Sequence, residues 1–138
     1  MKSIVFDTNV LLDLFVFNDF RALHLKQALQ EKQIDAVATQ KTLEEFADVL
    51  SRPLFSLEEN EQADILSEWQ LLSRVLSDQG LAAAPWQCED PDDQVFLNLA
   101  YSIRPSTLIS KDNALLKLAV KAAAEGISIT SDYTDFSH

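Results

Sequence analysis

Short apolar runs recur along this chain, and each is followed by a polar-faced segment long enough to form a helix. The runs do not alternate apolar with polar residues, which is typical of strands that are covered on both faces. They are predicted at residues 3–6, 36–38, 82–84, 106–110 and 127–129. Strands that alternate with helices in this way predict an α/β fold, a three-layer α/β/α sandwich with a central, mostly parallel sheet.

The segments between these runs carry the signals of helix starts and ends. Thr39 is expected to cap a helix that ends at residue 50, because Pro53 disfavours helix at the residue before it. Ser56 and Glu59 match the capping box S-x-x-E and predict the start of a long helix. Further helices are predicted at residues 9–17, 20–32 and 113–124, and another begins with Pro91 in its first turn.

The long helix predicted from Ser56 carries an apolar stripe along one face and is expected to end at Gly80. The stripe consists of Ile65, Trp69, Leu72 and Leu76. Apolar residues at this spacing indicate an amphipathic helix that packs on the core, and a contact between two copies in a homodimer is the alternative.

Length and composition limit the class of protein. Of 138 residues, 47% are hydrophobic and only two are glycine, so we expect one compact, helix-rich domain over residues 1–138. Cys88 is the only cysteine, which excludes an intramolecular disulfide, and we expect it to be a small buried residue. No apolar run approaches the ~20 residues of a membrane span, so a cytoplasmic location without a membrane partner is predicted.

The formal net charge of −11 limits how this protein could meet nucleic acid. An acidic surface disfavours non-specific binding to RNA, DNA or anionic membrane. Any role with nucleic acid therefore needs a local mechanism, such as bound divalent cations or a small basic patch. Most of the 22 acidic residues are expected to serve solubility alone.

A few acids occupy a more specific kind of position. Asp7 and Asp112 follow predicted strands, and Asp93 lies in the first turn of a predicted helix. A fourth acid, Glu44 or Glu45, lies in the helix after the second strand. Such positions meet at the carboxyl edge of a parallel sheet, where ligands bind. Converging carboxylates repel one another unless a hard cation joins them, so Mg²⁺ or Mn²⁺ is the expected ligand.

Each acid also has a purely structural interpretation. The run 90–93 could stabilise a helix N-terminus, and Asp112 could be an N-cap. Glu45 could belong to a capping box with Thr42. Asp7 is the exception, because either of the two residues after it could cap the next helix. These interpretations do not explain why the acids share one edge of the sheet.

Other signatures of chemistry are missing from the sequence. It contains no G-x-S-x-G elbow, G-x-x-x-x-G-K-[ST] loop or G-x-G-x-x-G turn, which argues against α/β hydrolases, P-loop enzymes and dinucleotide-binding enzymes. Aspartate-based phosphotransfer is also disfavoured. A receiver domain needs a paired acid cluster after its first strand, and a D-x-D phosphatase needs an acid where Asn9 stands.

Five segments in order carry a resemblance to a known family. They read VFDTNVLL, LEEFADVLSRP, CEDPDDQVFLNLA, TLISKDNALL and GISITSDYTDF, and together they cover nearly the whole chain. The chain resembles PIN-domain proteins, in particular the small single-domain ribonuclease toxins of bacterial and archaeal toxin–antitoxin systems. The resemblance implies a PIN-like fold and several acids that share one metal pocket.

By position in these motifs, the resemblance also implies which residues act. The catalytic and metal-binding acids would be Asp7, Glu45, Asp93 and Asp112, and Glu44 is the alternative to Glu45. The cofactor would be Mg²⁺ or Mn²⁺, as one or two ions.

Other residues receive supporting roles from the same resemblance. Asn9 and Ser110 would orient carboxylates or water. Lys41, Arg104 and Lys111 could guide the backbone of the substrate.

The function implied is hydrolysis of RNA phosphodiester bonds by the toxin of a toxin–antitoxin pair. The expected partners are an RNA substrate, an antitoxin protein that covers the acidic pocket, and a second copy in a homodimer. Two positions depart from the family pattern, because Lys111 stands where many relatives have glycine and Ala114 where relatives often have a further acid. The alternative is a catalytically inactive PIN-like domain that acts as a protein-interaction module.

Overall fold

Five parallel strands form one sheet in the order β3-β2-β1-β4-β5 in the computed structural model, which describes residues 2–135. The strands are β1 (Ser3–Phe6), β2 (Asp35–Thr39), β3 (Arg74–Leu76), β4 (Ser106–Ile109) and β5 (Ile127–Thr130). The longer helices are α1 (Thr8–Phe15), α2 (Leu23–Gln30), α3 (Gln40–Leu50), α4 (Glu59–Leu72) and α5 (Gln94–Ser102). Two short helices follow, α6 (Asn113–Leu116) and α7 (Ala119–Ala123).

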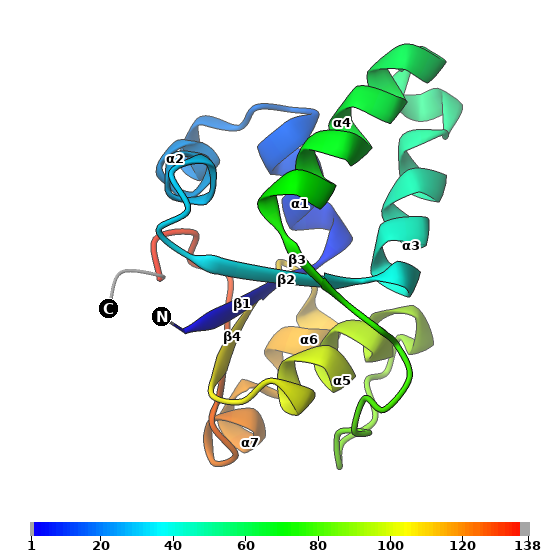
Figure 1. The fold of residues 1–138 in the computed structure, drawn as a ribbon. Coiled ribbons are helices and arrows are strands. Elements are labelled where there is room, and N and C mark those ends of the chain that lie inside the picture. Colours follow the sequence, from blue (N-terminus) through cyan, green and yellow to red (C-terminus); the bar gives the residue numbers. More distant parts are fainter. Residues whose placement is uncertain (1, 136–138) are drawn as a thin grey trace.

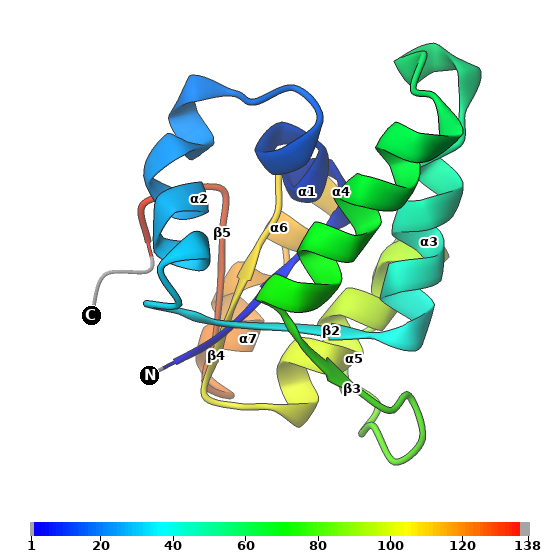
Figure 2. The same cartoon turned by 45° about the horizontal axis from the view of Figure 1, so that its top comes forward.

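Helices cover both faces of the sheet. In Figure 1, α1 to α4 lie on one side of the strands, and α5, α6 and α7 lie on the other; Figure 2 turns the layer of α1 to α4 toward the viewer. Along β1, Ile4 and Phe6 join the core under α1 to α4, and Val5 between them joins the core under α5 to α7. Both faces of the strand are therefore apolar, which explains its unbroken hydrophobic run. The predicted three-layer α/β/α sandwich is confirmed.

Trp69 is the largest fully buried side chain and fixes α4 to the sheet. Its ring lies 5.7 Å from that of Phe6 on β1 and 6.1 Å from that of Phe15 on α1, measured between centroids. Ile65 and Leu72 pack partly buried against the same core. The apolar stripe of α4 thus serves core packing, as expected.

The third strand is not where the sequence predicted it. Residues 82–84 form a loop, in which the Ala82 N–H donates to Ser102 Oγ and the Ala84 N–H to Asn98 Oδ1. The strand is β3, and α4 ends at Leu72 rather than near Gly80. Leu76 therefore belongs to a strand, not to the helix stripe. The backbone of β3 pairs with that of β2. This pairing outweighs the helical spacing of Leu72 and Leu76.

Helix starts differ from the prediction at one position and agree at another. Ser56 has a left-handed backbone (φ 50°) and ends a turn instead of capping α4, which begins after Glu58. There the Glu61 carboxylate accepts the Glu58 N–H at 3.0 Å. Thr39 caps α3 as predicted, in a box with Thr42. Further along, the helix predicted at 113–124 is divided into α6 and α7.

Two expectations from composition can be compared with the structure. Cys88 is buried, and burial raises the pKa of its thiol, as expected for a small interior residue. Within residues 2–135, no helix combines the length and the apolarity that crossing a bilayer requires.

Replacing Trp69 tests this packing. Trp69→Ala should lower the free energy of unfolding by about 3–5 kcal/mol, because a buried indole leaves a cavity that its neighbours fill only in part. Urea denaturation followed by circular dichroism measures the change. Trp86→Ala, which removes the half-buried tryptophan of the loop before α5, is the control and should cost less. Equal losses in both variants would contradict the assigned role of Trp69.

Candidate metal centre

The acids meet at the carboxyl ends of β1 and β4, the two central neighbours of the sheet. The connection from β1 leads to β2 on one side, whereas β4 lies on the other side of β1. Chain segments therefore diverge at this edge and leave a crevice between them. Asp7 follows β1 directly, and the segment from Ser110 to Asp112 follows β4.

Asp7 is a buried acid, with 2% of its surface exposed. One carboxylate oxygen accepts the Val10 N–H at 3.0 Å, so Asp7 itself caps α1. The sequence had suggested that one of the next two residues could fill this role. The other oxygen accepts the hydroxyl of Ser110. Burial raises the pKa of Asp7, and these two hydrogen bonds oppose the rise by stabilising the charged form.

Asp90, Asp93 and Asp112 form the tightest group of acids in the part of the chain that the structure describes. One carboxylate oxygen from each lies within 4.8 Å of the others. Asp90 and Asp112 also serve as caps, accepting the N–H groups of Asp92 at 3.0 Å and Ala114 at 2.9 Å. The structural and metal-binding interpretations of these acids are therefore compatible.

The two acids that face each other in this group titrate very differently. Burial, and then the adjacent Asp112 carboxylate, raise the pKa of Asp93 to about 8. The pKa of Asp112 is lowered, because a proton on Asp93 can be donated to it. When both carboxyls are ionised, this hydrogen bond is lost, and the buried Asp93 Oδ2 has no hydrogen-bond donor within residues 2–135. An unpaired buried oxygen beside two more carboxylates fits a hard divalent cation such as Mg²⁺ or Mn²⁺.

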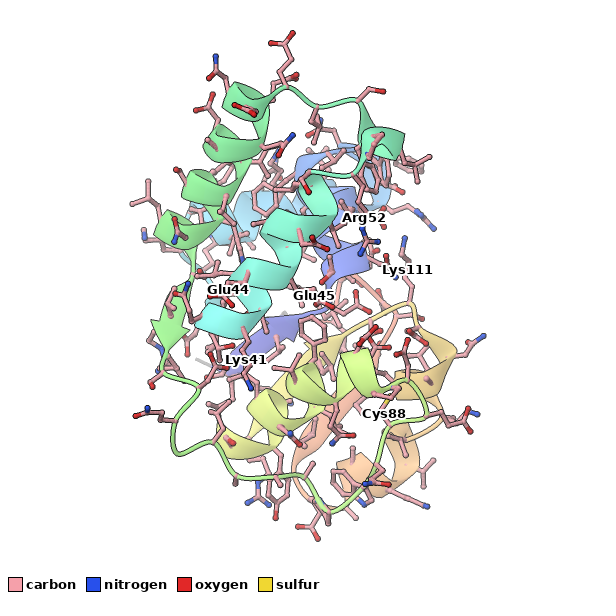
Figure 3. All side chains as sticks on the ribbon, turned by 90° about the vertical axis from the view of Figure 1, so that its right-hand side faces the viewer. Lys41, Glu44, Glu45, Arg52, Cys88 and Lys111 are labelled. Atoms are coloured by element: carbon pink, nitrogen blue, oxygen red, sulfur yellow. The ribbon has the colours of Figure 1, made fainter. Side chains whose placement is uncertain are left out.

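Glu45, rather than Glu44, faces the acids. Thr8 Oγ1 donates to Glu45 Oε2 at 2.8 Å, and the half-buried carboxylate has its pKa raised first by burial and then by Asp92 and Asp90. Glu44 is exposed and lies near Gln40 on the outer side of α3. Figure 3 shows Glu45 directed toward the carboxylates below α3, with Glu44 turned aside.

These residues line one cleft of about 260 Å³. Its wall contains all four acids implied by the resemblance, together with Asn9. The full lining is Asp7, Thr8, Asn9, Leu12, Glu45, Val49, Arg52, Phe55, Asp90, Asp92, Asp93 and Asp112. Ser110 lies behind this lining, where its Oγ donates to Asp7 and accepts the Asp112 N–H at 3.0 Å.

Some cleft residues were not recognised in the sequence. Asp90 and Asp92 had been assigned to a helix N-terminus alone, and Arg52 and Phe55 lie beyond the end of the predicted helix at 40–50. The signal for Asp90 was present, because three aspartates stand within four residues there. No local signal marks Arg52, whose place in the cleft depends on how α3 packs against α1.

The basic residues are arranged differently from the prediction. Arg104 precedes β4, at the opposite end of that strand from the cleft, and its Nε donates to the Tyr101 carbonyl at 2.7 Å. It cannot guide a substrate at the acidic edge. Lys41 is exposed at the start of α3 and does not line the cleft. Arg52 does line it, and Figure 3 shows Arg52 at the rim.

Lys111 has a specific structural partner. Its Nζ lies 2.7 Å from an oxygen of Asp13, a buried acid on α1 that also accepts the hydroxyl of Tyr133. The loop that carries Asp112 is thereby tied to the helix that Asp7 caps. Lysine at this position therefore joins two sides of the site.

The structure thus places clustered carboxylates at the strand ends of a parallel α/β sandwich, an arrangement that suits a divalent metal ion. The family model of the PIN domain matches residues 3–114, and the chain belongs to this family. PIN domains are generally nucleases that act on nucleic acid and typically bind divalent metal ions. A comparison with curated proteins gave no match.

The pKa of Asp93 predicts how pH affects the metal-free protein. An unfolded aspartate ionises near pH 4, whereas folded Asp93 ionises near pH 8, so between these values the folded state holds an extra proton. Stability should therefore fall as the pH rises from about 4 to about 8. The lowered pKa of Asp112 opposes this trend only below about pH 4.

Asp93→Asn should make this decline shallower and should exceed the wild type in stability at pH 8. Urea denaturation at several pH values in EDTA measures both effects. Asp64→Asn, an exposed substitution on α4, is the matched control and should follow the wild type. An unchanged slope in Asp93→Asn would show that another group sets the pH dependence.

Proposed function

We propose that this protein is a cytoplasmic ribonuclease that hydrolyses RNA phosphodiester bonds with a divalent cation, and that it is the toxin of a toxin–antitoxin pair. The observation that carries the proposal is the unpaired buried oxygen of Asp93 beside Asp90 and Asp112. Groups held this close without compensating charge are costly to folding, and a functional requirement explains their presence.

The residues proposed to hold Mg²⁺ or Mn²⁺, as one or two ions, are Asp7, Glu45, Asp93 and Asp112, and the geometry adds Asp90. When bound, such an ion lowers the pKa of water and offsets the negative charge that develops on the phosphate. The protein side chains hold the acids in place. Ser110 connects Asp7 with the backbone of Asp112, so these two acids keep their separation when both are charged.

When it is not a ligand of the ion, Glu45 is the residue that we assign to accept a proton from the attacking water. Its carboxylate is half-buried with a raised pKa, and Thr8 holds it through Oε2, which leaves Oε1 as the accepting atom. Arg52 is the cation of the cleft lining that we assign to the phosphate backbone. Its contact with Asp48 on α3 is long, at 3.4 Å, and both side chains are largely exposed, so the guanidinium can reorient toward a substrate.

The proposed antitoxin would be a protein that neutralises the cleft. The net charge of −11 and the concentration of carboxylates at one edge favour a partner that inserts a lysine or arginine there. Such an insertion would remove the repulsion among the acids without a metal ion. A homodimer is also proposed, with exposed Leu71 on α4 as a candidate contact.

Asp7→Asn tests the assignment directly. Asparagine keeps the shape of the side chain and an oxygen that can cap α1, so the fold should be retained. Cleavage of RNA with Mn²⁺ should fall by at least about a hundredfold, more than is typical of residues outside the metal's own ligands. Asp64→Asn is again the control, because it removes the same charge from an exposed site.

Parallel reactions with EDTA and a Mn²⁺ titration complete the experiment. The wild type should show saturable Mn²⁺ binding that Asp7→Asn weakens, measured by calorimetry. RNA cleavage that persists in Asp7→Asn or in EDTA would refute the metal-dependent mechanism. A folded wild type that neither binds Mn²⁺ nor cleaves RNA would instead favour the interaction module.

A further inference from the structure

The metal cleft has two chemically different kinds of lining. Besides the carboxylates, its lining contains the apolar side chains of Leu12, Val49 and Phe55, which we call the apolar wall. Leu12 and Val49 are buried members of the core, whereas Phe55 is half-buried and lies in the short helical turn Pro53–Phe55 after α3. A ring therefore stands at the cleft with part of its surface open.

A second aromatic ring extends this wall outward. Phe17 lies just beyond α1, is 57% exposed, and has its ring centroid 5.9 Å from that of Phe55 at an interplanar angle of 52°. Because Phe55 also packs against the core under α1 to α4, its ring is held in place. Phe55 thus combines a packed position with a partly open face at the acidic cleft, and Phe17 adds an exposed ring beside it.

A nucleotide has the same two-sided character as this cleft. Its phosphate is charged and its base is a flat, largely apolar ring that stacks on aromatic side chains. We propose that Phe55, extended by Phe17, is a stacking site for the base next to the scissile phosphate. This inference rests on the proposed function, because it takes the phosphate to lie at the carboxylates.

Two further features of the cleft fit an extended nucleotide strand. The cleft of about 260 Å³ is smaller than the roughly 300–1,000 Å³ of pockets that enclose whole ligands, which suits an extended strand passing through it. Arg52, three residues before Phe55, lies in the same lining and supplies a positive charge for the backbone.

Binding of a labelled single-stranded RNA, measured by fluorescence anisotropy, tests the site. Ca²⁺ replaces Mn²⁺ in this assay, because it binds carboxylate oxygens with looser geometry and should leave the strand intact. Phe55→Ala should weaken binding by about five- to a hundredfold, the factor expected for one stacked base. Leu54→Ala is the matched control, since Leu54 lies in the same turn, is 85% exposed and does not line the cleft.

An RNA with one abasic position shows whether the contact is to a base. Placed next to the mapped cleavage site, the abasic nucleotide should weaken binding to the wild type by a similar factor but change binding to Phe55→Ala little. This loss of additivity is the signature of a direct contact. Phe55→Trp should retain binding and show fluorescence quenching by RNA, which also excludes a folding defect as the cause.

The outcomes separate this inference from the proposed function. If the wild type cleaves RNA and Phe55→Ala binds and cleaves it equally well, the stacking site is wrong and the nuclease stands. If no cleavage occurs but RNA binding depends on Phe55, the stacking site stands without the nuclease. Binding of RNA that is unaffected by Phe55→Ala overturns the inference, even if the variant loses contact with a protein partner.

Discussion

The buried carboxylate of Asp7 is the point on which the site depends. It joins three segments, because its backbone N–H donates to Ile109 on β4, one oxygen caps α1 and the other accepts Ser110. A charged group with 2% exposure would be costly without such partners. The same hydrogen bonds that make the burial tolerable also fix where the acid points. The Ser110 hydroxyl also accepts the Asp112 N–H, so it fixes the position of Asp112 relative to Asp7.

The remaining acids are held against their mutual repulsion. Asp93 ionises near pH 8 because burial and Asp112 oppose its charge, and Glu45 has its pKa raised by burial and by acids across the cleft. The folded state tolerates this repulsion because the helices and strands that hold the acids are stabilised elsewhere, chiefly by the two apolar cores. The Lys111–Asp13 pair adds one compensating contact at the rim without filling the cleft. Strain of this kind is expected where a positive ligand is required.

The order of elements and the shared edge of the acids could be predicted because they depend on local signals. Apolar runs marked β1 and β4; Asp7 follows the first run directly, and Asp112 comes two residues after the run at 106–110. The strand β3 could not be predicted, because it has three residues, two of them exposed, and continues the leucine spacing of α4. The choice of Glu45 over Glu44 depends on the rotation of α3 about its axis. Only the structure shows this rotation, through the hydrogen bond from Thr8 to Glu45. The apolar wall was missed for the same reason, since Leu12 and Phe55 meet through tertiary packing.

The proposed ribonuclease must bind its cation and its substrate together. The net charge of −11 repels a phosphate backbone at long range, and the cleft repels it most strongly of all. A divalent cation at the carboxylates lowers the local negative charge, so it should tighten RNA binding, and by linkage RNA must tighten cation binding by the same factor. Long-range steering contributes little to such an enzyme. Its affinity must then come from short-range contacts, and the contact of a base with the apolar wall is the one that neither salt nor net charge weakens.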